Sequence, residues 1–301
     1  MKKETSEKSS QRVTNGDWKF EEVSRSVHRV NICLPRASDE FTALLMSDIH
    51  WDNPHCKRDQ LKTILDEARE RNAPILDVGD FFCAMQGKWD KRASKSDIRP
   101  EHQKSNYLDS LVDTATDYLK PYADLLTLRG QGNHETAIRK HHETDLTERL
   151  TERLRAVGSP ARVGGFSGFV RFFVWHNKTR QRSITYWYHH GHGGGGPVTR
   201  GVIQTNRRAV YLSDTDIVHT GHTHDSWIVP IQRIQLNKRL VVEQTRQVHV
   251  TTPGFKDEYE DGHGGWHIER GAPPKPTGAA WLRIYRPRGT QGIDFEISEA
   301  R

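Results

Sequence analysis

The sequence predicts an α/β fold in which a parallel sheet with flanking helices packs against a second, mixed sheet. The first half of the chain alternates short apolar runs with amphipathic helical patterns, whereas the second half holds mainly strand-like runs. The length of 301 residues suits one large domain or two small ones. Because no clear linker interrupts the chain, we expect a single domain over residues 26–301.

Residues 1–25 are charged, polar and aperiodic, so we expect them to form a mobile arm outside the core. The domain then reads as strand, helix, strand, helix and strand, over residues 42–47, 57–71, 73–78, 107–119 and 124–129. In the first helix, Leu61, Ile64 and Ala68 recur at spacings of three and four, which gives one apolar face. This alternation is typical of strands that pair in parallel through helical crossovers.

The second half begins with a predicted helix over residues 143–157. The strand-like runs that follow cover residues 168–175, 183–188, 216–219, 227–229, 240–250 and 279–285. Between the last two runs, residues 253–278 mix Gly and Pro with charges, which indicates a long loop. We expect these strands to form the second sheet, with a strand-and-loop extension from about residue 230 to the C-terminus.

The composition excludes several classes of protein. Cys33, Cys56 and Cys83 are widely spaced and form no C-x-x-C pair, so neither a disulfide framework nor a thiolate zinc site is expected. The mean hydropathy is −0.80, and no stretch reaches the roughly 18 to 20 apolar residues that span a bilayer. The first residues lack the apolar segment of a signal peptide, so we expect a cytoplasmic protein with no membrane partner.

Polar motifs follow five of the apolar runs, and they contain part of a large set of 17 histidines. These motifs are Asp48-Ile-His50, Gly79-Asp80, Gly132-Asn-His-Glu135, His189-His-Gly-His192 and Gly221-His-Thr-His224. In an open α/β sheet the carboxyl ends of neighbouring strands share one crevice, so the motifs are expected to converge. A set of oxygen and imidazole ligands without sulfur suits Mn, Fe or Zn.

In this order and spacing, D-x-H, GD, GNHE, HG and GHTH between Asp48 and His224 resemble the calcineurin-like metallophosphoesterase superfamily. The resemblance implies a two-sheet β-sandwich flanked by helices and a dinuclear metal centre that hydrolyses phosphate mono- or diesters. It implies two divalent cations, with Mn²⁺ preferred and Fe or Zn as alternatives.

Specific roles follow from the same resemblance. One metal would be held by Asp48, His50 and His224, the second by Asn133, His190 and His222, and Asp80 would bridge the two. His134 would lie over the substrate phosphate as a catalytic proton donor or charge stabiliser, beside Asn133 as a substrate contact. A bridging Asp80 and two cations would activate a water molecule for attack on phosphorus.

Three departures from the family pattern leave alternatives open. Cys83 stands where the family often has a carboxylate, and Asp77 or Asp52 are the candidates to replace it. His189, His190 and His192 all lie in the fourth motif, where the position directly before Gly favours His190. Beyond a glycine run at residues 193–196, Arg200 is a candidate phosphate contact, weighed against an exposed helix charge.

Three functions are compatible with these motifs. The first is a phosphodiesterase or nuclease on single-stranded or nicked nucleic acid, favoured by a pI near 9.2 and by the aromatics Trp175, Tyr186, Trp187 and Tyr188. The second is a phosphomonoesterase on a nucleotide, a small molecule or a phosphoprotein. The third is a binding protein that retains the fold without catalysis; the filled ligand positions argue against it.

Overall fold

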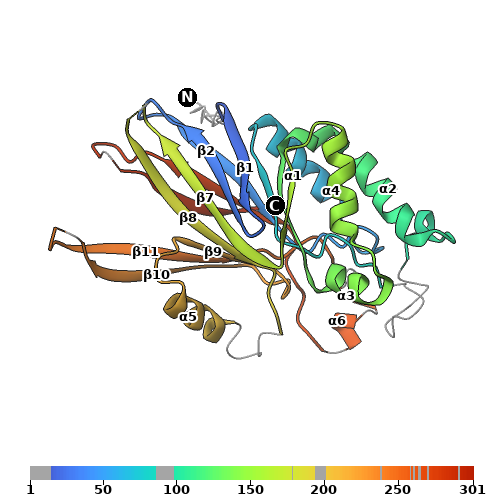
Figure 1. Ribbon diagram of the computed structural model, residues 1–301. Coiled ribbons are helices and arrows are strands. Elements are labelled where there is room, and N and C mark those ends of the chain that lie inside the picture. The colour runs from blue at the N-terminus through green and yellow to red at the C-terminus, as the bar shows by residue number, and fades with distance from the viewer. Residues whose placement is uncertain are drawn as a thin grey trace, which may run out of the picture.

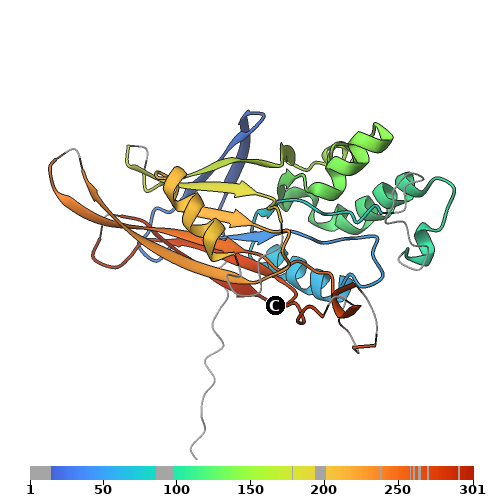
Figure 2. The same ribbon diagram turned by 90° about the horizontal axis from the view of Figure 1, so that it is seen from below.

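The computed structural model describes residues 15–85, 98–177, 179–193, 201–237, 239–257, 259, 262–263, 266–269, 271–290 and 292–301. Two sheets lie face to face, and helices cover the outer side of the smaller sheet (Figures 1 and 2). The predicted fold class, a two-sheet α/β sandwich flanked by helices, is confirmed. No described helix is long and apolar enough to cross a membrane.

The smaller sheet has six strands in the order β13-β12-β3-β4-β5-β6. Its strands are β3 (Glu40–Met46), β4 (Ile75–Asp77), β5 (Leu126–Gly130), β6 (Arg162–Gly165), β12 (Ala279–Tyr285) and β13 (Asp294–Ala300). β3 to β6 are parallel, and β12 is antiparallel to both of its neighbours. The parallel pairs are joined through helices α1 (Arg58–Glu70), α2 (Tyr107–Leu119), α3 (Asn133–His142) and α4 (Leu146–Ala156) and two short 3₁₀ segments, Pro100–His102 and Lys120–Leu125.

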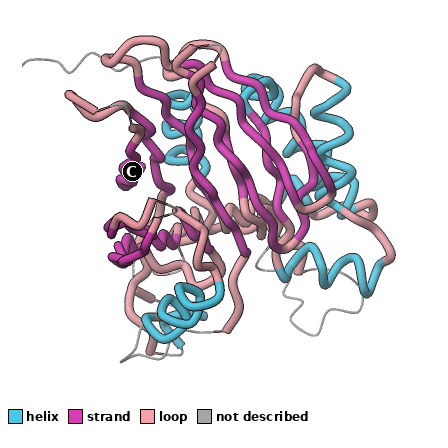
Figure 3. The backbone as a smooth tube through the Cα atoms, turned by 60° about the vertical axis from the view of Figure 1, so that its left-hand side comes forward, coloured by secondary structure: helices cyan, strands magenta, loops and turns pink. Residues whose placement is uncertain are grey.

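The larger sheet has seven strands in the order β1-β2-β7-β8-β9-β11-β10, which run side by side in Figure 3. They are β1 (Trp18–Ser24), β2 (Val27–Cys33), β7 (Ser167–Trp175), β8 (Gln181–His189), β9 (Ile217–Thr220), β10 (Trp227–Leu236) and β11 (Val242–Thr251). Helix α5 (Val202–Tyr211) lies beside this sheet, and the short α6 (Trp266–Glu269) follows later in the chain (Figure 1).

Apolar side chains fill two layers, one on each side of the smaller sheet. On β3, Leu44 and Met46 pack with the helices, whereas Leu45 packs between the sheets against residues such as Val30 and Phe172. Since successive side chains of a strand point to opposite faces, a strand buried on both faces must be apolar throughout. This explains the continuous apolar run that identifies β3 in the sequence.

Several predicted elements are confirmed and others need correction. The strands β3, β4, β5, β7, β8, β9, β11 and β12 and the helices α1, α2 and α4 lie where the sequence places them. The division of the two sheets between the two halves of the chain is wrong, because β12 pairs with β3 and the N-terminal β1 and β2 join the larger sheet. Strands β10 and β11 belong to the larger sheet and β12 and β13 to the smaller one, and β10 begins where the sequence predicts it but is longer than residues 227–229.

The predicted arm of residues 1–25 is wrong for its last part. Residues 18–24 form β1, an edge strand that pairs with β2, and Asn15 is buried, with its side chain bonded to Thr42. Only Phe20 of β1 is buried, so an edge strand exposed on most of its length carries no apolar signal in the sequence. Residues 1–14 lie outside the described part of the chain.

Candidate metal centre

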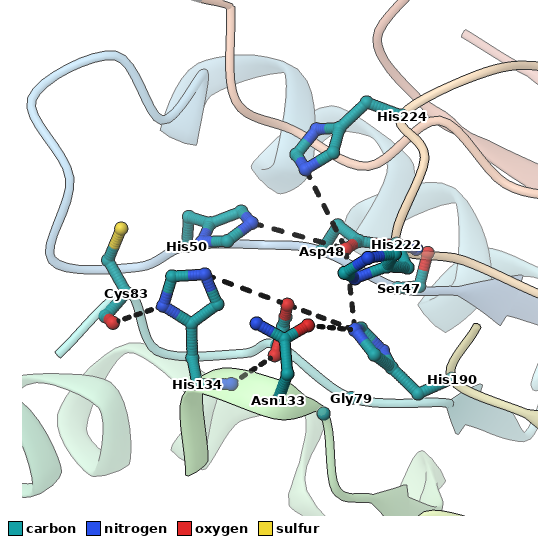
Figure 4. A network of polar contacts seen from close by, with 12 residues as sticks. Ser47, Asp48, His50, Gly79, Cys83, Asn133, His134, His190, His222 and His224 are labelled. Atoms are coloured by element: carbon teal, nitrogen blue, oxygen red, sulfur yellow. Dashed lines mark hydrogen bonds and ion pairs between the residues drawn. The ribbon is translucent and has the colours of Figure 1, made fainter. Parts of the chain in front are cut away.

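The five polar motifs meet at one rim of the sandwich, where β3, β4, β5, β8 and β9 end (Figure 4). Asp48 and His50 follow β3, and Asp80 follows β4. Asn133 and His134 begin α3 after β5. His190 directly follows β8, and His222 and His224 follow β9. The topology thus brings together residues up to 176 positions apart, as the rule for strand ends predicts.

The first group of ligand-type side chains consists of Asp48, His50 and His224, with one atom of each within 4.8 Å of the others. Asp48 Oδ1 lies 3.7 Å from His224 Nε2 and 4.0 Å from His50 Nε2. The His50 and His224 rings stack with centroids 5.1 Å apart. Burial raises the pKa of Asp48 to about 7, and the nearby His190 acts in the opposite direction.

The second group consists of Asp80, His190 and His222, again with one atom of each within 4.8 Å of the others. His190 Nε2 lies 3.0 Å from Asp80 Oδ2 and 3.2 Å from Asn133 Oδ1. His190 Nδ1 donates to the Val78 carbonyl at 3.2 Å, which turns Nε2 toward the centre. Burial disfavours the charged form of both His190 and Asp80. The contact with Asp80 nevertheless raises the pKa of His190 to about 10. His190 and His134 in turn hold the pKa of Asp80 well below its usual value.

The two groups adjoin each other. His190 Nε2 of the second group lies 4.0 Å from Asp48 Oδ1 of the first, and the backbone N–H of His222 donates to Asp48 Oδ2 at 2.8 Å. The seven side chains that the sequence assigns to two metals thus lie in one cluster, with Asn133 joined to it through His190.

The backbone at these positions is held in an unfavourable conformation. Asp48, His50, Asp80, His222 and His224 have φ between 50° and 73°. The left-handed region costs a residue with a side chain about 1 to 3 kcal/mol and persists where the surrounding structure imposes it. The fold therefore gives up local stability to direct these five side chains to a common point.

Two glycines make room for the carboxylates. A Cβ on Gly132 would lie 2.0 Å from Asp80 Oδ1, and one on Gly221 would lie 2.3 Å from Asp48 Oδ2. Real Cβ atoms do not approach so closely, so any other residue at either position would displace a carboxylate. The glycines of the GNHE and GHTH motifs are thus part of the site.

The donor atoms fit divalent cations. Among the described residues, Asp48 Oδ1 and both ring nitrogens of His50 are buried without a hydrogen-bond partner. An unmatched buried polar group costs about 1 to 3 kcal/mol, a cost that ligation of a cation would remove. Carboxylate, amide and imidazole donors, with no thiolate in either group, suit Mn, Fe or Zn.

His134 lies beside the two groups and its orientation is fixed. Its Nδ1 lies 2.6 Å from the Cys83 carbonyl oxygen, which can only accept, so Nδ1 carries the hydrogen. Its Nε2 faces the cluster, 3.8 Å from Asp80 Oδ2. The Cys83 main chain thus supplies the acceptor that fixes the His134 ring. Burial raises the pKa of the Cys83 thiol to about 12, although Cys83, His50 and His134 also have ligand atoms within 4.8 Å of one another.

Asp52 holds the turn that carries this carbonyl. Its carboxylate accepts the N–H groups of Cys83 at 2.7 Å and Ala84 at 2.9 Å, and the Tyr107 hydroxyl at 2.7 Å. Asp77, the other candidate in the sequence, instead pairs with Arg129 at 3.1 Å in the buried layer below the rim. Of the two candidates, Asp52 is the one linked to His134, because it holds the backbone turn whose Cys83 carbonyl accepts the hydrogen of His134 Nδ1.

Glu135, to which the sequence assigns no role, holds the GNHE turn against the loop after β4. Its buried carboxylate accepts the N–H groups of Asp80, Phe82 and Gly132 at 2.9 to 3.1 Å. Burial and the nearby Asp80 raise its pKa to about 8. Since α3 begins at Asn133 and buries only Glu135 and Ile138, its helix has no apolar periodicity and is missed by the sequence prediction.

A buried chain of polar side chains lies behind Asp48. Tyr186 OH lies 2.6 Å from His219 Nδ1, His219 Nε2 lies 2.9 Å from Thr252 Oγ1, and this hydroxyl lies 2.7 Å from Ser47 Oγ. Burial lowers the pKa of His219 to about 3, so its ring is neutral. Only proximity to the last motif could have drawn attention to His219; Thr252 carries no signal in the sequence.

The other candidate histidines lie away from the two groups. His189 stacks on Trp187 and accepts the Gly191 N–H at 2.8 Å, so His190 is the member of the fourth motif that enters the cluster. His192 contacts the His189 ring. His141 and His142 end α3, at its far end from Asn133. Arg200 and the glycines at positions 194–196 lie outside the described residues.

The rim of the sandwich thus holds two groups of His and Asp side chains that are candidate metal sites. No protein-family model matches the sequence, and no curated protein sequence matches it significantly. Solved structures do match.

One is a conserved phosphoesterase of Streptococcus pneumoniae, itself assigned by prediction, at 12% identity and a TM-score of 0.28 over 87% of this chain and 99% of that chain. Vps29 of Entamoeba histolytica, solved with Zn²⁺, matches at 9% identity and a TM-score of 0.33 over 87% and 100%. A protein of Staphylococcus aureus assigned as a 5′-nucleotidase, in complex with α-ketoglutarate, matches at 11% identity and 0.39 over 87% and 54%. All three TM-scores are below 0.5, so the description of the fold rests on the strand order of this chain itself.

Proposed function

We propose that this chain is a phosphoester hydrolase that holds two divalent cations, Mn²⁺ in the first instance. The observation that carries the proposal is the convergence of two ligand groups, one around Asp48 and one around Asp80, at five strand ends. Cations bound there would neutralise phosphate oxygens and lower the pKa of a water molecule toward neutrality. The chain's own residues then position the phosphate and manage protons.

His134 is the residue best placed to act on the substrate. With Nδ1–H donated to the Cys83 carbonyl, a protonated ring would present Nε2–H toward the cluster. This hydrogen is placed to stabilise a phosphate oxygen or to reach the departing oxygen of the ester. Asp80, which accepts the backbone N–H of His134 at 2.9 Å, ties the helix that carries this ring to the second group.

We further propose a phosphodiester substrate, with single-stranded or nicked nucleic acid as its natural source. The net charge of +6 supports attraction to a polyanion. Three of the aromatic side chains that the sequence suggests for stacking on bases are not accessible, because Tyr186 and Tyr188 are fully buried and Trp187 is 8% exposed. Trp175 lies at the end of β7 opposite to the rim, since it pairs with Gln181 while Ser167 pairs with His189. The nucleic-acid part of the proposal therefore rests on charge.

The test compares a diester with a monoester. Protein reconstituted with Mn²⁺ is assayed with bis-p-nitrophenyl phosphate and p-nitrophenyl phosphate, then with labelled single-stranded, nicked and duplex DNA and with RNA. Turnover of the diester and of single strands is the expected result. Turnover of the monoester alone would replace the diesterase with a phosphomonoesterase. Less than one bound cation per chain after reconstitution would favour a non-catalytic binding protein.

A further inference from the structure

A small pocket lies beside the second group, between α5 and the loops that carry His190 and His222. Gly191, which follows His190, and Gly221, which precedes His222, form part of its wall. Its volume is about 120 Å³. This volume is large enough for one tetrahedral anion.

Arg208 of α5 supplies a cation to this pocket. Burial lowers the pKa of its guanidinium, which shows that the group has lost part of its water, and the interaction that opposes this loss comes from Tyr211. Within the described part of the chain, no carboxylate forms an ion pair with Arg208. A partly dehydrated guanidinium without a carboxylate is suited to bind a phosphate through paired N–H groups.

The other charges around the pocket do not cancel that of Arg208. Asp225, the carboxylate among the described lining residues, is bonded to Lys275 Nζ at 2.6 Å. His249 lies close enough to Arg208 to be affected by its charge, and burial lowers the pKa of His249 to about 4. Its ring is therefore neutral at pH 7 and leaves the positive charge of Arg208 as it is.

The remaining lining offers hydrogen-bond donors. Thr205, Thr223 and Gln204 are polar side chains of the wall. Gly201 and Val202 also line the pocket and begin the ten-residue helix α5, so the positive end of its dipole faces the same space. Charge, donors and size all fit an anion.

We propose that this pocket binds a second phosphate of the substrate while the scissile phosphate lies at the two ligand groups. The substrate class is then a phosphodiester with a neighbouring phosphate, such as a nucleotide bisphosphate or an oligonucleotide. This inference rests on the proposed function, and it adds a specificity-determining residue, Arg208, that lies outside the metal centre.

The test uses thymidine 5′-(p-nitrophenyl phosphate) with and without a 3′-phosphate. In both, water adds to the 5′-phosphorus and p-nitrophenolate leaves, so only the remote phosphate differs. For the wild type we expect kcat/KM at least about tenfold higher with the 3′-phosphate, the worth of one charge-assisted contact. Arg208→Gln should abolish this preference, and Arg208→Lys should restore part of it. Arg207→Gln, an exposed position of the same helix, is the matched control and should keep the preference.

A binding arm separates this inference from the proposed function. Mn²⁺-loaded protein is titrated with thymidine 3′,5′-bisphosphate and thymidine 5′-monophosphate, for the wild type and both glutamine variants. Tighter binding of the bisphosphate that is lost in Arg208→Gln alone supports the pocket even if no ester is hydrolysed. Equal affinity for the two nucleotides, or equal loss in Arg207→Gln, overturns the inference, whereas turnover of bis-p-nitrophenyl phosphate still sustains the hydrolase.

Discussion

The two ligand groups differ in how far they are satisfied by the protein itself. In the first group, Asp48 Oδ1 and the ring of His50 are buried without hydrogen-bond partners in the described chain. In the second group, Asp80 and His190 form an ion pair at 3.0 Å, and Asn133 Oδ1 lies 3.2 Å from the same His190 nitrogen. The first group therefore gains most from a cation, whereas the second must exchange an internal ion pair for one.

The substitution Asp80→Ala tests whether the two groups depend on one another, and it has the largest expected effect. It removes a carboxylate of the second group and the acceptor of the His134 N–H. Loss of several kcal/mol of charge stabilisation lowers kcat by about a thousandfold or more. Metal analysis should find both cations lost; one retained cation would show that the first group binds by itself.

The substitution His134→Gln leaves both groups intact and removes the group that faces the substrate. We expect kcat to fall by about 100-fold to 1,000-fold with two cations still bound, as for loss of a general acid or an oxyanion donor. Steady-state kinetics and metal analysis of the same preparation provide the measurement. Loss of a cation in this variant would instead make His134 a ligand through Nε2, which faces the cluster.

Calorimetric titration of the metal-free protein with Mn²⁺ examines the difference between the groups directly. We expect two steps at pH 7, the tighter at the first group by about tenfold or more, since unmatched buried atoms are relieved there. The weaker step should release a proton, because His190 must be neutral to bind and its pKa is raised to about 10. Its affinity therefore rises with pH.

Two variants assign the steps. His50→Ala should remove the tighter step and His222→Ala the weaker one. The opposite assignment would contradict the comparison between the groups.

The substitution Asp52→Asn loosens the turn that orients His134 without touching either group. An amide oxygen can replace only part of the carboxylate's three contacts, so kcat should fall by about tenfold with little change in KM. Tyr107→Phe removes one contact and should have a smaller effect. An increase in KM with unchanged kcat would show that Asp52 does not position His134.

The substitution His219→Gln has the smallest effect and concerns stability. The folded pKa of His219 is about 3, below the usual 6.5, so the unfolded chain binds the proton more readily and stability falls as the pH drops below 6.5. Between pH 6 and pH 5 the wild type should lose about 1 kcal/mol more than the variant, since Gln does not titrate. Urea unfolding of the metal-free proteins at the two pH values measures the difference.

The elements that the sequence predicts are those with several buried apolar side chains in a regular pattern. β3 and α2 are examples, with six of seven and five of thirteen residues buried. The missed elements, β1, β2, β6, β13, α3 and α5, expose much of their surface or follow glycines, so their positions depend on tertiary pairing. Sheet membership of β12 is likewise set by its partner β3, which no local pattern reveals.

In the site, ordered motifs identify the side chains that converge, but not the contacts behind them. Glu135, Thr252 and Asp52 act on backbone N–H groups or hydroxyls of residues distant in the sequence. No regular spacing in the sequence identifies hydrogen bonds between residues so far apart. Arg208 belongs to a pocket formed by four segments of the chain, and among the described residues its lack of a carboxylate partner is visible only in three dimensions.

The close approach of Gly132 and Gly221 to the carboxylates has a consequence for how related chains should be compared. A relative could retain every histidine and aspartate of the centre and still be inactive if either glycine were replaced, because the added methyl group would occupy the place of a carboxylate oxygen. We therefore expect Gly132→Ala and Gly221→Ala to weaken metal binding although every His and Asp of the two groups is retained.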